Sequence, residues 1–264
     1  MKAFMQKALS SFSFQKGSKE IIRLCRPFLD QMEFINFYYV RINRKGELIY
    51  LTNQVGYAMD YWEAGLPLCT GFNDVPGEVQ STVLLWANKL NREILSFAEA
   101  QKCYDGSSFI NRYYDQVQFT SFQRKTPVEN PSQFYLENLV KLRCWLRDFE
   151  MKNISLIGQA EKKPMFLPDE YLAPQKHSFY YKKNLELHFN QIHATVSFRE
   201  MDCLYFYTKG FTCPHIAKLL GVSPRTIETH LEAVKNAFGL SSRDGLAALS
   251  YGNPILQSYT PRFK

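Results

Sequence analysis

The sequence predicts an α+β protein, with an antiparallel sheet and flanking helices in the N-terminal part and an all-α domain of four helices at the C-terminus. Two observations indicate this. Before residue 160, strand and helix patterns mix without regular β-α-β alternation. After residue 196, helical spacing alone remains. We therefore predict an α+β domain over 1–160, a linker over 161–195 and a helical domain over 196–264.

The N-terminal part contains a predicted hairpin. Residues 34–42 (FINFYYVRI) are aromatic and β-branched, 43–46 (NRKG) have turn chemistry, and 47–53 (ELIYLTN) form the returning strand. A helix is expected over 55–65, ending at Gly65. The remaining predicted elements are a helix over 18–30, a strand over 117–124, and, over 79–102, either a strand and a helix or one helix.

Residues 134–163 show the spacing of a long amphipathic helix. Such an apolar stripe packs into a core or, alternatively, forms a dimer contact, and both interpretations remain open. The stripe consists of Phe134, Leu139, Leu142, Leu146 and Phe149. The proline-rich stretch that follows predicts the linker, with a short helix around 183–192.

Composition limits the function classes. The net charge of +7 permits a polyanionic partner, but residues 196–250 carry six basic and five acidic residues and hence a net charge of only +1. The six cysteines show no C-x-x-C spacing, which favours reduced thiols, a cytoplasmic location and no metal site. No apolar run is long enough to span a membrane. No cofactor-binding or catalytic motif occurs, so neither a cofactor nor an enzyme is expected.

The C-terminal segment predicts two helices joined by a glycine turn. Ser197 and Glu200 form a capping-box pattern before a helix that ends at Gly210. Thr212 is expected to cap a short second helix, and Gly221 supplies the turn. Ser223 then precedes a third helix whose apolar residues are Ile227, Leu231, Val234 and Phe238. A helix with one polar, exposed face suits the DNA major groove.

This segment resembles the LuxR-type helix-turn-helix DNA-binding domain over about 54 residues. The residues that carry the resemblance are Arg199-Glu200, Leu204, Gly210, Ile216-Ala217, Leu220-Gly221-Val222-Ser223, Thr226-Ile227, His230-Leu231 and Phe238-Gly239. The resemblance implies a homodimer that inserts the third helix of each copy into double-stranded DNA. Acidic residues stand at Glu228 and Glu232, where many relatives have basic ones.

The same resemblance implies roles for individual residues. Thr226 would contact a phosphate, Glu228, Thr229 and Glu232 would contact bases, and Lys235 would lie near the DNA backbone. The expected DNA-binding residues are Thr212, Ser223, Arg225, Thr226, Glu228, Thr229, Glu232 and Lys235. The fourth helix would lie at the dimer interface, with Leu240, Leu246 and Leu249 as its contact residues.

The N-terminal part resembles the autoinducer-binding domain of quorum-sensing LuxR regulators and also PAS-like sensors, through FINFYYVRI, Thr52-Asn53 and the Tyr57/Tyr61 pair. The resemblance implies a sensor domain with a small-molecule effector, held by a carboxylate and enclosed by rings. The expected pocket residues are Tyr39, Tyr57, Tyr61, Asp74 and Trp86. Adjacent aromatics of this kind also occur in ordinary cores, so both interpretations remain.

The leading hypothesis is thus a sequence-specific transcription regulator. Its alternative is a protein-interaction adaptor with a degenerate helix-turn-helix that binds DNA weakly. The acidic recognition face and the low local charge motivate this alternative. The salt dependence of DNA affinity would separate the two hypotheses.

Overall fold

A computed structural model describes residues 2–66, 81–90, 92–168 and 184–251, together with residues 253, 256, 259 and 261. The chain forms two compact units. The first consists of Met1–Phe149 and Ser155–Tyr181, and the second of Glu150–Ile154 and Lys182–Lys264. Each has its own fold and is described by itself.

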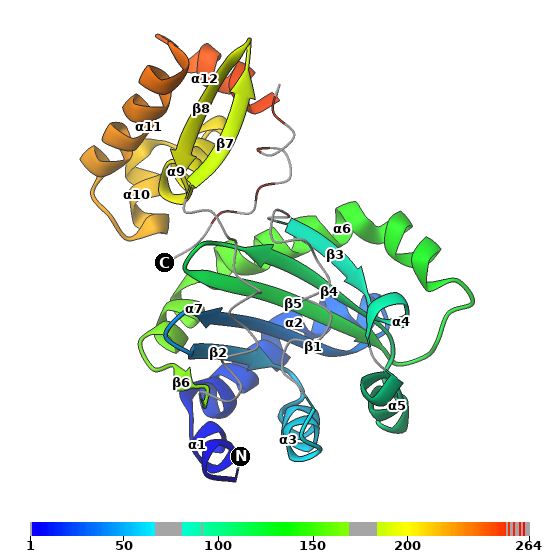
Figure 1. The fold of residues 1–264 in the computed structure, drawn as a ribbon. Coiled ribbons are helices and arrows are strands. Elements are labelled where there is room, and N and C mark those ends of the chain that lie inside the picture. The colour runs from blue at the N-terminus through cyan, green and yellow to red at the C-terminus, as the bar shows by residue number, and fades with distance from the viewer. Residues whose placement is uncertain are drawn as a thin grey trace. The chain divides into compact units, whose positions relative to one another are not determined.

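The first unit is built on an antiparallel sheet in the order β3-β4-β5-β1-β2-β6 (Figure 1). The strands are β1 (Phe34–Asn43), β2 (Glu47–Thr52), β3 (Ser81–Leu85), β4 (Tyr104–Arg112), β5 (Gln116–Arg124) and β6 (Met165–Phe166). The predicted α+β class, the hairpin of β1 with β2 and the strand β5 are confirmed. Strand β4 was not predicted, because Asp105, Gly106 and the serines that follow have low β-propensity.

Helices cover both faces of this sheet (Figure 1). Side chains of α1 (Lys2–Leu9), α3 (Val55–Glu63) and α5 (Arg92–Ala100) pack on one face. Side chains of α2 (Ser18–Gln31), α6 (Pro131–Lys152) and α7 (Ile154–Glu161) pack on the other. A short π-helix (Ser13–Gly17) precedes α2, and α4 (Trp86–Lys89) follows β3. The ambiguous stretch 79–102 therefore contains a strand followed by helices.

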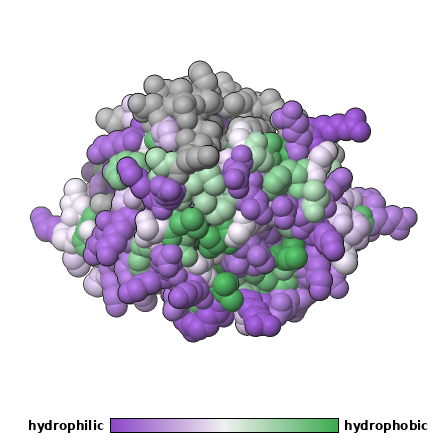
Figure 2. Space-filling view, turned by 90° about the horizontal axis from the view of Figure 1, so that it is seen from below, coloured by the Kyte–Doolittle hydropathy of each residue, from purple (hydrophilic) through white to green (hydrophobic). Residues whose placement is uncertain are grey.

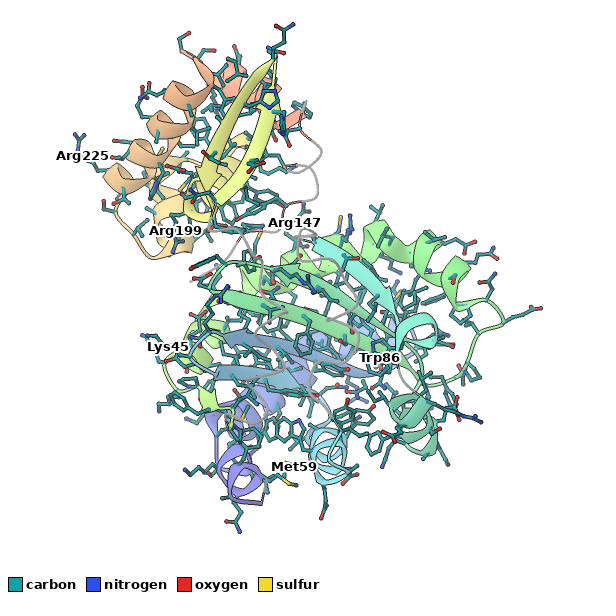
Figure 3. The ribbon with its side chains drawn as sticks, in the orientation of Figure 1. Lys45, Met59, Trp86, Arg147, Arg199 and Arg225 are labelled. Carbon is teal, nitrogen blue, oxygen red and sulfur yellow. The ribbon has the colours of Figure 1, made fainter. Side chains whose placement is uncertain are left out.

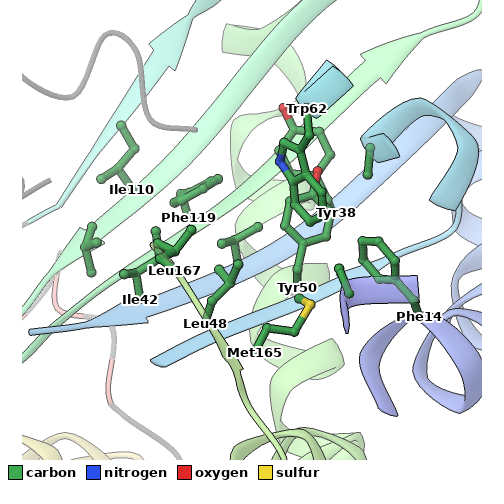
Figure 4. Close-up of a cluster of buried hydrophobic side chains, with 14 of the residues drawn as sticks. Phe14, Tyr38, Ile42, Leu48, Tyr50, Trp62, Ile110, Phe119, Met165 and Leu167 are labelled. Atoms are coloured by element: carbon green, nitrogen blue, oxygen red, sulfur yellow. The ribbon is translucent and has the colours of Figure 1, made fainter. Parts of the chain in front are cut away.

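Large aromatic side chains pack with aliphatic ones in the core on the α1/α3/α5 face (Figure 4). Phe14 stacks on Trp62 with ring centroids 5.5 Å apart, and Tyr50 meets Trp62 edge-on at 5.3 Å. Each buried aromatic side chain removes 150–250 Å² from water, so these rings supply much of the stabilisation of the unit. The high aromatic content of the chain is thus explained mainly by core packing.

Helix α6 has buried apolar residues on one face and exposed apolar residues on another. Leu142 and Phe149 of the predicted stripe are buried in the core on the α2/α6/α7 face, as the core interpretation requires. On the outward face of the helix, Leu136 and Val140 are 72% and 75% exposed. These two side chains are one helical turn apart and form a separate apolar strip that faces solvent.

The second unit begins with a hairpin of β7 (Asn184–Phe189) and β8 (Ile192–Ser197). The expected linker with a short helix around 183–192 is wrong at this point. Leu185, Leu187 and Val196 alternate with exposed residues, and burying them on one face favours strands over a helix. Four helices follow, as predicted: α9 (Phe198–Thr208), α10 (Cys213–Leu220), α11 (Pro224–Phe238) and α12 (Arg243–Tyr251).

Candidate functional site

The first helix of the candidate DNA-binding unit has the predicted capping box. The Ser197 hydroxyl accepts from the Glu200 amide at 3.2 Å, and the Glu200 carboxylate accepts from the Ser197 amide at 2.7 Å. This pair satisfies two amides that otherwise have no helical partner. Gly210, with φ of +91°, ends the segment. The local sequence thereby determines where α9 begins and ends.

A three-residue turn joins α10 to α11. Gly221 closes α10 in the left-handed conformation, with φ of +64°. The Ser223 hydroxyl then accepts from the Thr226 amide at 3.1 Å and caps α11. Thr212 stands at the N-cap position of α10 as predicted, but its side chain makes no capping hydrogen bond. Caps and glycine together set the direction in which α11 leaves the turn.

Helix α11 has the two faces that the sequence predicts. Ile227, Leu231, Val234 and Phe238 are buried. The opposite face exposes Arg225, Glu228, Thr229 and Glu232, with Lys235 half-buried beside them. Arg225 projects from the helix into solvent (Figure 3). The structure therefore brings most of the expected base-contacting residues onto one accessible surface.

Two interactions change what this surface offers to a partner. The ammonium of Lys235 lies 2.9 Å from the Glu232 carboxylate, so the two charges largely cancel. The Thr229 hydroxyl donates to the Arg225 carbonyl at 2.9 Å, so its oxygen is left as an acceptor. Glu228 is exposed and accepts only. The middle of α11 thus presents hydrogen-bond acceptors on a nearly neutral face.

The predicted dimer contacts on the fourth helix are wrong for two of three residues. Leu246 and Leu249 are fully buried, and α12 packs against α9. A side chain without exposed surface is unavailable to a second copy. Leu240 is half-buried and lies close to Gly245, where an added Cβ would be 3.2 Å from its Cδ2. Leu246 and Leu249 therefore belong to the core of this unit.

The predicted effector residues separate onto the two faces of the sheet. Tyr39 belongs to the core that faces α2 and α6, where its ring centroid lies 5.7 Å from that of Phe149. Tyr57, Tyr61 and Trp86 belong to the core on the opposite face. Successive residues of a strand point to opposite faces, so Tyr38 takes the place predicted for Tyr39. Asp74 lies outside the described residues.

The remaining aromatic residues form a cluster between the sheet and helices α3 and α5. Phe97 of α5 meets Tyr57 and Tyr61 edge-on, with centroids 5.4 and 5.5 Å apart. The Trp86 indole donates to the hydroxyl of Ser108, a residue of β4, at 2.9 Å. Tyr57 and Tyr61 are half-buried. Tyr57 and Tyr61 are thus close together and partly accessible, whereas Trp86 is buried in the same core beside Tyr38.

Polar groups among these rings escaped the sequence analysis. Gln123 donates to the Tyr57 hydroxyl at 2.8 Å, and Ser108 and Ser121 share a hydrogen bond of 2.7 Å across β4 and β5. Burial raises the pKa of the Tyr57 and Tyr38 hydroxyls, so both stay protonated and uncharged at neutral pH. Ser121 and Gln123 lie on the predicted strand β5, whereas strand alternation would have identified Ser108 only after β4 had been recognised.

Two surface features of the first unit bear on ligand access. Apolar side chains gather near the middle of the surface on the α1/α3/α5 side, among hydrophilic ones (Figure 2). A separate groove of about 700 Å³ lies on the α2 side, lined by Leu29, Phe34 and Asn53 among others. That groove includes none of the predicted effector residues.

Cysteines and metal ligands show no reactive cluster in the described part of the chain. Burial raises the pKa of Cys25 to about 12 and of Cys103 to about 11, so both thiols stay protonated. Within the described residues, no group of three or more histidine, cysteine, aspartate or glutamate side chains is placed to hold a metal ion. The helices described there include none long and apolar enough to cross a membrane.

Helices α9, α10 and α11, with side-chain caps on α9 and α11 and a glycine turn between α10 and α11, define a helix-turn-helix unit. Residues 194–250 match the family model described as bacterial regulatory proteins, luxR family, and so this segment is a LuxR-type helix-turn-helix domain. No curated protein matches the chain.

Solved structures of similar length also match. One is SdiA in complex with octanoyl-rac-glycerol, 14% identical, with 98% of this chain and 97% of that chain covered and a TM-score of 0.38. Another is Escherichia coli SdiA, 15% identical, with 96% and 98% covered and a TM-score of 0.33. A third is the phage VqmA-DPO complex, 14% identical, with 94% of each chain covered and a TM-score of 0.28.

Proposed function

We propose that the protein is a dimeric, sequence-specific transcription regulator of LuxR type, in which the first unit senses a small-molecule effector. The exposed polar face of α11, on a helix held by the Gly221 turn and the Ser223 cap, supports this most directly. Such a face on the second helix of a helix-turn-helix enters the major groove. The matched family model supports the same function.

The salt dependence of DNA affinity tests the proposal. A regulator releases counterions from each phosphate that it neutralises, so its affinity should fall at least tenfold between about 50 and 200 mM salt. The adaptor alternative is favoured by the Glu232–Lys235 pair, which leaves the face nearly neutral. An adaptor would show little affinity at either salt concentration. Fluorescence anisotropy measures the DNA affinity and its change with salt. The DNA is a pool of duplexes, before and after selection for binding.

Substitutions in the middle of α11 should change sequence preference. Cytosine N4 and adenine N6 are the major-groove donors, and acceptors at Glu228 and Thr229 suit them. We expect Glu228→Ala or Thr229→Ala to reduce the preference for the selected duplex over a single-base variant by about tenfold. Quantitative binding to the selected duplex and its variants is the measurement.

Lys235→Ala is the matched control for these substitutions. In the proposed complex Lys235 exchanges the Glu232 carboxylate for a DNA phosphate, so its removal should weaken binding to all duplexes alike and reduce the salt slope by about 1. If Glu228→Ala and Thr229→Ala bind selected and random duplexes as the wild type does, the assignment of base contacts to α11 fails.

The effector, in this proposal, binds among Tyr57, Tyr61 and Trp86, between the sheet and helices α3 and α5. The described side chains there are aromatic rings, hydroxyls and amides, including Ser108 and Gln123. A site of this chemistry favours an uncharged molecule with a flat or apolar body and few polar groups. Octanoyl-rac-glycerol, bound by SdiA in one of the similar structures, is such a molecule.

The dimer contact is proposed on the outward strip of α6. Leu136 and Val140 are exposed there, and a second copy would remove them from water. We expect Val140→Glu to weaken dimerisation by at least about tenfold, because the carboxylate would lose its hydration in the interface. Analytical ultracentrifugation over a concentration series measures this.

Lys141→Glu is the control for the dimer prediction. It places the same side chain at the neighbouring exposed position of α6, about a quarter turn away from the strip. It should leave the dissociation constant nearly unchanged. Sedimentation of the Val140→Glu protein that is indistinguishable from wild type would remove this helix from the proposed interface.

A further inference from the structure

The β7–β8 hairpin carries two histidines that face each other across its strands. His188 and His193 are partners in the strand register, and both are exposed. Their ring centroids lie 4.2 Å apart with the ring planes at 85°. Side chains this close on one face of a hairpin act on the same ligand without any change in the fold.

The backbone that holds these rings is fixed from several sides. Asn190 and Gln191 both have positive φ, 48° and 69°, as a two-residue type I′ hairpin turn requires. The inner face of the hairpin is buried through Leu185, Leu187 and Val196. In addition, the Asn253 amide donates to the His188 carbonyl at 3.2 Å, on the side of β7 away from β8. The two imidazoles are therefore attached to an ordered frame.

We propose that His188 and His193 together chelate a divalent transition-metal ion, such as Ni²⁺, Cu²⁺ or Zn²⁺. Imidazole nitrogen is a preferred ligand of these ions. Once one ring has bound the ion, the other is held beside it, so the second bond forms without the entropy cost of a free ligand. No third protein ligand is placed to close the site among the described residues, so water completes the coordination.

A metal ion bound by both histidines would connect β7 to β8 one residue pair before Phe189 and Ile192, the pair that closes the turn. A ligand that binds only the folded state stabilises it by mass action, so the metal should stabilise the second unit. The hairpin lies directly before α9 in the chain, and β8 contacts both α9 and α11. The site would therefore stabilise the frame of the helix-turn-helix without touching its exposed face.

Titration of the full chain with Ni²⁺ by calorimetry tests the proposal. A Cys144→Ser background removes the exposed thiol as a competing ligand. We expect His188→Gln and His193→Gln each to weaken binding at least tenfold. We also expect the double variant to bind no more weakly than either single one, because a chelate is lost with its first member. Ni²⁺ should also raise the unfolding temperature of the Cys144→Ser parent protein, and not that of the histidine variants.

His215→Gln, at an exposed position on α10, is the matched control and should keep the parent affinity. Circular dichroism checks that all variants fold. The proposal is overturned if the parent shows no saturable binding, if the single variants bind as tightly as the parent, or if their losses add as for two independent sites. DNA binding is a separate measurement, so its failure leaves this result interpretable.

Discussion

Replacing Gly106 with alanine should lower the free energy of unfolding of the first unit by about 2 kcal/mol. An added Cβ would lie 2.3 Å from Cδ2 and Cε3 of Trp86, inside the ring's van der Waals surface. The indole has little freedom to move, because it is only 5% exposed and donates to Ser108 at 2.9 Å. The substitution must therefore displace the ring, break its hydrogen bond or bend β4.

Tryptophan fluorescence during urea denaturation measures this effect. All three tryptophans, Trp62, Trp86 and Trp145, belong to the first unit, so the signal reports its unfolding. Gly158→Ala in α7 is the matched control, because an added Cβ there meets nothing within 4 Å and alanine favours a helix. It should keep or raise the stability. Two variants with equal urea midpoints would contradict the clash.

A second measurement assigns the cost to Trp86. In a Trp86→Phe background the ring next to Gly106 is smaller, so Gly106→Ala should cost clearly less than in the wild type. Gly106→Ala should also weaken effector binding, because Trp86 lies in the proposed effector site. If the cost is the same in both backgrounds, its origin is the backbone of β4 rather than the indole.

The sequence predicted the helix-turn-helix well because its signals are local. The Ser197/Glu200 capping box, the Ser223 cap and the left-handed Gly221 each act within three or four residues, and each is present in the structure. Likewise the spacing of Ile227 and Leu231 identified the buried face of α11. Local chemistry of this kind needs no knowledge of the rest of the fold.

The proposed effector site was harder to predict because it depends on which face of a strand each residue occupies. Tyr38 and Tyr39 are adjacent and equally aromatic, and only the register with β2 and β5 decides that Tyr38 faces α3. Ser108 and Ser121 come together across two strands, one of which the sequence analysis had missed. A one-residue difference in register exchanges the two faces.

The predicted dimer leucines show the complementary difficulty. Leu246 and Leu249 have the spacing of a helix face, and spacing alone does not say whether that face meets another helix of the same chain or a second copy. Both leucines are buried and α12 packs against α9, so this face meets a helix of the same chain. The histidine pair was missed because its His-x₄-His spacing has meaning only across a hairpin turn, and that segment had been predicted as linker.

Tyr259→Phe should destabilise the second unit by about 2 kcal/mol, although the residue lies beyond the segment that matches the family model. The Tyr259 hydroxyl lies 2.7 Å from Oδ1 of Asp202 and 3.1 Å from the Phe198 carbonyl. Asp202 is fully buried in α9, and the guanidinium of Arg199 is 3.7 Å from its other oxygen. Phenylalanine keeps the ring but removes the donor, which leaves a buried carboxylate with one hydrogen bond fewer.

Hydrogen exchange of the α9 amides is the appropriate measurement, because the second unit contains no tryptophan. Exchange should accelerate in Tyr259→Phe and stay unchanged in Tyr207→Phe, where the half-buried ring still lies under Arg243. Asp202→Asn should reduce the cost of losing the hydroxyl, because the uncharged side chain needs the donor less. Wild-type exchange in Tyr259→Phe would mean that the Tyr259 hydroxyl contacts α9 without stabilising it. Accelerated exchange would mean that the stable helix-turn-helix unit extends to Tyr259, nine residues past the matched segment.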